Sequence, residues 1–286
     1  MSDTGNELTP SAVVRAAAGE FLAGHPERAG ALVREQNGDE RTVDLTQTAL
    51  VASGQVLQIV QEAASDELVE ALLASIGRLN APRPELRALV VETVRRFGEP
   101  NFALLCRRAA HRLLGAAGDL ALDAPMDTVL ALAAMVTQFD NNTDMIRLAC
   151  ARADQLILIS EAPFRLVWGQ VAGDTDAQRQ WLRMLAETGD PADLLVWYFG
   201  LVHGLNGRTE SGDGNPALDA LAADVAAGNL DTAAAIAKGF AAKLEPAHLI
   251  GYAAQHLTRA VIAEAERRDV PAGTVLDDLW ERATTA

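Results

Sequence analysis

Ionisable side chains recur at helical spacing in the segment "EPAHLIGYAAQH", residues 245–256. Glu245 lies three residues before His248, and Tyr252 and His256 follow at four-residue steps, so an α-helix would stack them along one side. Glu-x-x-His is half of a bundle di-iron ligand set, which needs a second copy and two further glutamates. This chain has one copy, and His248 and His256 would be about 12 Å apart along a helix. We therefore expect no metal site and no cofactor.

A helical wheel gives the same segment a simpler interpretation. It places Glu245, His248, Tyr252 and His256 on the polar side of an amphipathic helix, opposite Leu249, Ile250, Ala253 and Leu257. We expect a solvated helix surface. The alternative is a polar pocket covered by another helix, which would require His248 and Tyr252 to be buried.

Arginine is concentrated between residues 78 and 112. That window holds eight arginines against three glutamates, a charge of +5, so the rest of the chain carries −20. Guanidinium groups donate paired hydrogen bonds to carboxylates and phosphates, so the window predicts a surface for a binding partner. The residues that we expect on this surface are Arg87, Arg95, Arg107, Arg108, His111 and Arg112. The alternative is that acidic residues of the same chain, such as those at 119, 123 and 127, cover the arginines.

Aromatic residues are concentrated further along the chain. Six of the 13 lie between Phe164 and Phe199, which is typical of a helix core. The alternative is a small-molecule pocket formed by Trp168, Trp181, Trp197 and His203, with the glycine-rich segment 206–216 as a lid.

Nucleophilic catalysis finds little support in the residue spacing. The chain has no Gly-x-Ser-x-Gly segment of the kind that presents a catalytic serine. Cys106 and His111 are five residues apart on one predicted helix and would point to different sides. We therefore favour a protein without enzymatic activity.

The elements that hold these residues are all predicted to be helices. Apolar residues recur at three- and four-residue steps in about a dozen segments, separated by short breaks rich in Gly, Pro, Asp and Asn. The segment 81–97 has Pro84 near its first turn and an apolar face at Leu86, Val90 and Val94. Asp190 and Pro191 mark a helix start, and Pro271 stops the helix that begins near residue 246. We predict an all-α fold of antiparallel helical hairpins, either a bundle or an irregular repeat-like stack.

Loop composition suggests a division of the chain. The segment 118–125 would separate an N-terminal helical half, residues 11–118 with the arginine-rich window, from a C-terminal half, residues 123–286. The two halves form one continuous domain in the alternative interpretation. Residues 1–10 are polar and are expected to fray.

Charge and composition narrow the function. The 286 residues carry a net charge of −15, which disfavours nucleic acid and anionic membranes as general partners. The longest apolar runs are too short to span a bilayer, the first residues have no apolar signal region, and two cysteines without metal spacing suit the cytoplasm. We expect a non-enzymatic interaction or scaffold protein that uses the 78–112 region to bind another macromolecule, most simply a protein, or itself. The alternatives are a small-molecule sensor or enzyme with the aromatic pocket, and a regulator that contacts nucleic acid.

Overall fold

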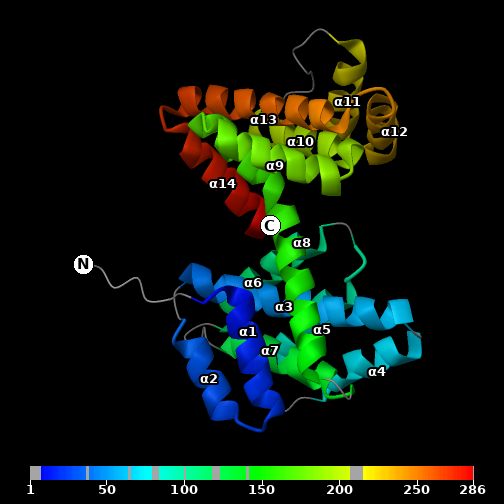
Figure 1. Ribbon diagram of the computed structural model, residues 1–286. Coiled ribbons are helices and arrows are strands. Elements are labelled where there is room, and N and C mark those ends of the chain that lie inside the picture. The colour runs from blue at the N-terminus through cyan, green and yellow to red at the C-terminus, as the bar shows by residue number, and fades with distance from the viewer. Residues whose placement is uncertain are drawn as a thin grey trace. The chain divides into compact units, whose positions relative to one another are not determined.

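The computed structural model is all-helical throughout the residues it describes, which are 8–36, 39–63, 66–78, 84–99, 101–117, 123–139, 142–206 and 215–285. Over these ranges it has fourteen α-helices and no strand (Figure 1), so the all-α prediction is confirmed. The helices are α1 Pro10–Leu22, α2 Pro26–Arg34, α3 Asp39–Ala63, α4 Asp66–Gly77, α5 Pro84–Arg95, α6 Phe102–Ala117, α7 Asp123–Val136, α8 Asn142–Ala172, α9 Thr175–Thr188, α10 Pro191–Asn206, α11 Pro216–Ala227, α12 Leu230–Ala241, α13 Pro246–Arg268 and α14 Ala272–Thr285.

Several helix ends lie where the sequence signals predicted them. The Asp190 carboxylate accepts hydrogen bonds from the backbone N–H groups of Ala192, at 2.8 Å, and Asp193, at 3.3 Å. It thereby satisfies amide groups that have no partner within the first turn of α10. The C-terminal end of α13 also lies where it was predicted. This helix ends at Arg268, and Asp269 adopts a left-handed conformation before Pro271.

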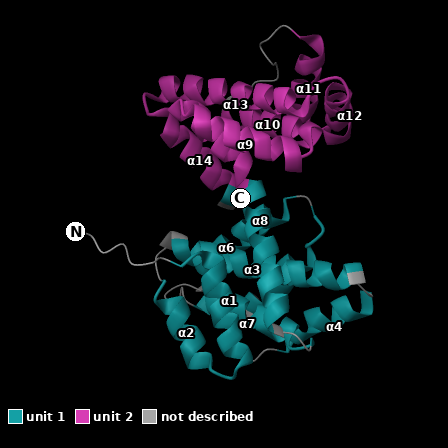
Figure 2. Cartoon of the chain, viewed as in Figure 1, with its two compact units in different colours: residues 1–160, 284–286 teal, residues 161–283 magenta. Residues whose placement is uncertain are grey.

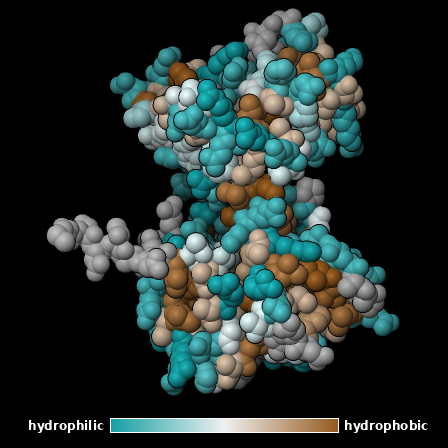
Figure 3. Space-filling view, viewed as in Figure 1, coloured by the Kyte–Doolittle hydropathy of each residue, from teal (hydrophilic) through white to brown (hydrophobic). Residues whose placement is uncertain are grey.

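The chain forms two compact units (Figure 2). Unit 1 comprises residues 1–160 and 284–286, and unit 2 comprises residues 161–283. The division falls within α8, in which no loop interrupts the helix. Residues 118–122, where the sequence suggested a division, lie outside the described residues, between α6 and α7 of unit 1. On the face shown in Figure 3, hydrophobic surface is broader on unit 1 than on unit 2.

Helix α3 is the centre of unit 1. It contacts α1, α4, α5, α6 and α7, and almost every residue from Thr42 to Leu57 is buried. Its buried hydroxyls donate within the helix, for example from Ser53 to the carbonyl oxygen of Ala49 at 2.8 Å, so burying them leaves no hydrogen bond unmade. A Cβ atom on Gly54 would lie 2.4 Å from the Phe102 ring, so α3 and α6 approach closely at this glycine.

Unit 2 is built around α10 and α13, which pack against each other and contact α12, while α9 also packs on α13 and α11 on α10. Tyr198 of α10 is fully buried and donates its hydroxyl to the carbonyl oxygen of Pro163 at 2.9 Å. Pro163 lies inside α8, so this bond ties the α8 backbone to α10. Within the described ranges, no helix is both long enough and apolar enough to cross a membrane.

Candidate anion-binding groove

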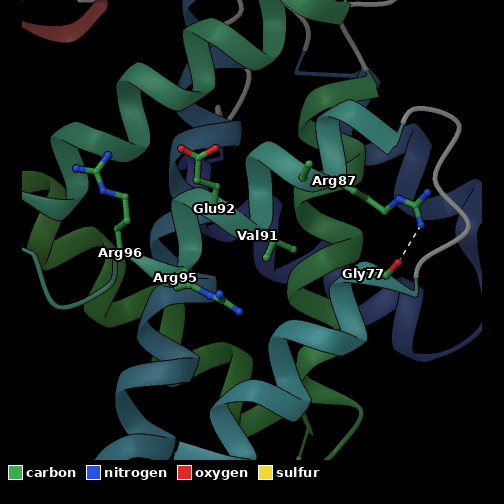
Figure 4. A pocket seen from close by; sticks show the side chains of 7 residues that line it. Gly77, Arg87, Val91, Glu92, Arg95 and Arg96 are labelled. Carbon is green, nitrogen blue, oxygen red and sulfur yellow. Dashed lines mark hydrogen bonds between the residues drawn. The ribbon is translucent and has the colours of Figure 1, made fainter.

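A surface groove of about 690 Å³ runs alongside α5 in unit 1 (Figure 4). We call it the α5 groove, and its lining residues are Gly77, Arg87, Ala88, Val91, Glu92, Arg95 and Arg96. Two of the residues predicted to bind a partner, Arg87 and Arg95, therefore lie together in one concave site.

The pattern of α5 explains why Arg95 is exposed and Arg87 is only half-buried. Leu86, Val90 and Val94 are at most 2% exposed and form its core face, as predicted. Arg87, Val91 and Arg95 each follow one of these residues, so they form a parallel row about 100° further around the helix. In Figure 4, Val91 lies between Arg87 and Arg95 along α5, and the side chains of Glu92 and Arg96 point away from that of Arg95.

Each guanidinium of the groove already has an acceptor in the chain. Arg87 donates to the carbonyl oxygen of Gly77, the last residue of α4, at 3.1 Å. Arg95 donates to the Glu70 carboxylate of α4 at 3.0 Å, and both side chains are more than half exposed.

Arg96 is paired with a carboxylate of its own segment. It donates two hydrogen bonds to the Glu99 carboxylate, at 2.8 and 2.7 Å, and these bonds lower the pKa of Glu99. The Arg96 side chain also points away from Arg95 (Figure 4), so Arg87 and Arg95 are the candidate anion-binding groups.

The charged side chains of the groove are of the kind that can bind an anion. Its described lining carries three arginines against one glutamate, and the remaining side chains are apolar or absent. The described lining residues include no Ser, Cys, His or Tyr. It can hold a carboxylate or phosphate that has an apolar group beside it.

Helix α6 carries the other predicted partner-binding residues, and Arg107 is not on the surface where it was expected. Its exposed fraction is 7%, and its guanidinium donates to Asp44 at 3.0 Å and to Gln47 at 3.1 Å, both on α3. The expectation of an exposed Arg107 is wrong because α6 packs against α3, α5 and α7, so more than one side of it is covered. Arg108 and His111 are half-buried, and Arg112 is exposed.

The predicted aromatic pocket residues are placed in unit 2. Trp168 and Trp197 lie 6.1 and 5.1 Å from Phe164, measured between ring centres. Trp280 of α14 adds a fourth ring, 4.7 Å from Phe164. These rings pack against one another and against the core of unit 2, as expected where the aromatic residues form a helix core.

The other two pocket candidates lie in different surroundings. Trp181 of α9 is covered by the Arg165 guanidinium at 5.5 Å, a cation–π contact. His203 is half-buried in the last turn of α10. Residues 207–214 of the expected lid lie outside the described residues.

The residues of the 245–256 segment are not gathered into one site. Glu245 and His248 are exposed and Tyr252 is half-buried. His256 is buried, contrary to the wheel, and stacks on Phe199 at 4.7 Å, because α10 covers that side of α13. Within the described ranges, no three His, Cys, Asp or Glu side chains converge on a point where a metal ion would fit.

Sequence inspection missed five groove residues and overlooked one useful signal. The missed residues are Gly77, Ala88, Val91, Glu92 and Arg96. The recurrence of Arg87, Val91 and Arg95 at four-residue steps marks a row of mixed charged and apolar side chains beside the core face. The geometry of this row is the basis for the functional proposal below. No protein-family model, curated protein or solved structure matches this chain.

Proposed function

We propose that this chain is a non-enzymatic interaction protein that binds acidic segments of another protein in the α5 groove. One observation carries the proposal: two guanidiniums, Arg87 and Arg95, flank the apolar side chain of Val91 on one face of α5. A guanidinium matches the two oxygens of a carboxylate. An apolar contact between the two charges adds affinity that a free inorganic anion cannot use.

Charge around the groove favours a protein partner over nucleic acid. Outside the 78–112 window, unit 1 carries six arginines against eighteen Asp and Glu residues, a net charge of −12. A long polyanion would meet this negative surface beyond the groove and be repelled. Among the described lining residues there is also no aromatic side chain on which a base could stack. A short acidic segment avoids both problems.

The internal pairing of Arg95 leaves it able to exchange partners. The ion pair with Glu70 is solvent-exposed on both sides, with 57% and 66% of the side chains accessible. Exposed pairs of this kind contribute about 0–1 kcal/mol. A partner carboxylate can therefore replace Glu70 at little cost to the stability of unit 1.

We place this function in the cytoplasm. Cys106 and Cys150 are unpaired and buried, which suits a reducing compartment. Burial raises the pKa of Cys150 to about 12 and that of Cys106 well above its ordinary value, so both thiols stay protonated and unreactive.

Site-specific photo-crosslinking tests the proposal. Ala88 lines the groove and is exposed, so Ala88→benzoylphenylalanine places a photoreactive group inside it. The matched control is Ala151→benzoylphenylalanine, at an exposed alanine of α8. We expect adducts in cells at position 88 whose crosslinked peptides are rich in Asp and Glu. An adduct of twice the chain mass would identify a second copy as the partner.

The charge dependence of the adduct makes the test specific. Arg87→Glu with Arg95→Glu should abolish the adduct at position 88, whereas the same reversal at the exposed Arg28 and Arg34 of α2 should leave it. Persistence of the adduct after reversal in the groove, or equal adducts at positions 88 and 151, would contradict the proposal. So would an adduct made of nucleic acid.

A further inference from the structure

Three side chains of the α5 groove form a straight row, and their spacing defines the ligand groups that could contact them together. Arg87, Val91 and Arg95 recur at four-residue steps, and each step advances about 6 Å along the helix axis. The two guanidinium-bearing positions are therefore about 12 Å apart, with an apolar side chain between them. Ala88 and Gly77 border the row and are small, so another backbone can approach closely.

We propose that the occupant of the groove is an acidic α-helix of the partner protein, lying along α5. This inference rests on the proposed function and specifies its partner. A helix that runs alongside α5 has the same rise per residue, so two carboxylates about seven residues apart reach Arg87 and Arg95 together. A small apolar residue midway between them packs on Val91, as in other helix-in-groove complexes.

A helical occupant is favoured over an extended one by the backbone of the groove. An extended peptide needs donors and acceptors for its own N–H and C=O groups when it is buried. Ala88, Val91 and Glu92 lie inside α5, so their backbone N–H groups bond within the helix, and the described lining contains no strand edge. A helix satisfies its backbone internally and needs only side-chain contacts.

Glu92 adds a second element of selectivity. It lies on the row next to Arg87, Val91 and Arg95 and is exposed. A ligand acid facing Glu92 would be repelled, whereas a neutral or basic side chain there would be accepted. The expected ligand helix therefore has its acids on one narrow face rather than all around.

Matched peptides provide the test. The first is a designed helix of about 18 residues with two glutamates about seven positions apart and alanine and leucine between them. The second is an isomer of identical composition in which one glutamate is moved two positions, onto the opposite side of the helix. The third has proline at its centre and cannot form the helix. Binding to the full chain is measured by fluorescence anisotropy of the labelled peptide, with circular dichroism to follow peptide helicity.

We expect the first peptide to bind up to about fivefold more tightly than the other two, because only it engages both guanidiniums at once. Its binding should fall by a similar factor in the variant Arg87→Glu with Arg95→Glu. The same peptide with lysines in place of its glutamates should bind that variant, and this rescue shows that the variant is folded.

The outcomes separate this inference from the proposed function. Equal binding of all three peptides would contradict the inference that the ligand is helical. So would a failure of all three to bind while the crosslink at position 88 still depends on Arg87 and Arg95. In either case the proposal that the groove binds acidic segments would stand. If the first peptide binds wild type and the reversed variant equally, its site is elsewhere, and both proposals lose their support. Inorganic phosphate competing as well as the peptide would show a small-anion site instead.

Discussion

Units 1 and 2 fill their cores with different kinds of side chain. All four tryptophans and both tyrosines lie in unit 2, where Phe164 is surrounded by the rings of Trp168, Trp197 and Trp280. The core of unit 1 is mostly Ala, Val and Leu around α3, and its helices approach closely at Gly54. The aromatic-rich part of the sequence thus packs into the core of unit 2. In the arginine-rich window, by contrast, Arg87, Arg95 and Arg96 line a surface groove.

Charge distinguishes the units as well. Unit 2 carries ten Lys and Arg residues against eighteen Asp and Glu, a net charge of −8. Several of its arginines pair with acids three or four residues away, as Arg165 does with Glu161 and Arg179 with Asp176. In unit 1 the arginines are clustered in sequence, and α5 presents two of them at the ends of one row. Local pairing stabilises helices slightly, whereas the row lines the α5 groove.

The largest expected effect comes from removing the central ring of unit 2. Phe164 is fully buried, so Phe164→Ala should destabilise unit 2 by about 3–5 kcal/mol through lost burial and the cavity left behind. Urea unfolding followed by tryptophan emission reports on this unit alone, since unit 1 has no tryptophan. Phe164→Leu should cost less. If the urea midpoint measured by tryptophan emission were unchanged in Phe164→Ala, the aromatic rings would not be what stabilises the core of unit 2.

Gly54→Ala is the corresponding change in unit 1. The added methyl would lie 2.4 Å from the Phe102 ring, so we expect overpacking to cost about 1–3 kcal/mol. Both cysteines are buried in unit 1, so the rate and urea dependence of thiol labelling measure its opening. Gly115→Ala on α6 is the control, because nothing lies within 4 Å of its Cβ position. Equal labelling of the two variants would contradict the close α3–α6 approach.

A smaller effect is expected for Glu70→Gln. This change removes the carboxylate that now accepts from Arg95, so the acidic helical peptide should bind about two- to fivefold more tightly. Stability should change by less than about 1 kcal/mol. Asp66→Asn, at an exposed acid of α4, is the control for net charge. Weaker binding by Glu70→Gln would mean that Glu70 positions Arg95 rather than competing for it.

The smallest effect concerns Glu99 at acidic pH. Hydrogen bonds from Arg96 lower the pKa of Glu99 in the folded chain. The unfolded chain therefore binds the proton first, and the stabilisation is present above about pH 4.5 and is lost as the pH falls through the folded pKa. Glu99→Gln should flatten this part of the stability curve, measured by urea unfolding followed by far-ultraviolet circular dichroism at each pH. An identical pH dependence in the variant would show that the pair does not contribute.

Much of the helical framework could be predicted because its signals are local. Asp190 and Pro191 start α10, Pro271 follows the end of α13, and Leu86, Val90 and Val94 form the buried face of α5, all as the spacing indicated. Capping residues and amphipathic spacing act within one helix, so both can be recognised in the sequence of that helix alone.

Side-chain environments created by several helices could not be predicted in this way. A helical wheel assumes one buried side, but α6 contacts α3, α5 and α7, and α13 contacts α9, α10 and α12. Arg107 and His256 are therefore buried although each lies beside polar neighbours in sequence. Likewise, the partner of Arg107 is Asp44, which lies 63 residues away in the sequence. The spacing of residues within one helix cannot predict a contact between two helices.

Hydrogen–deuterium exchange with the acidic helical peptide tests the central claim most directly, that unit 1 binds acidic partners in the α5 groove. The account predicts that the peptide slows amide exchange in segments covering α5 and the end of α4, with no change in α9, α10 or α13 of unit 2. The variant Arg87→Glu with Arg95→Glu should show no such protection. Protection in unit 2 with none along α5, or protection along α5 that survives this charge reversal, would contradict it.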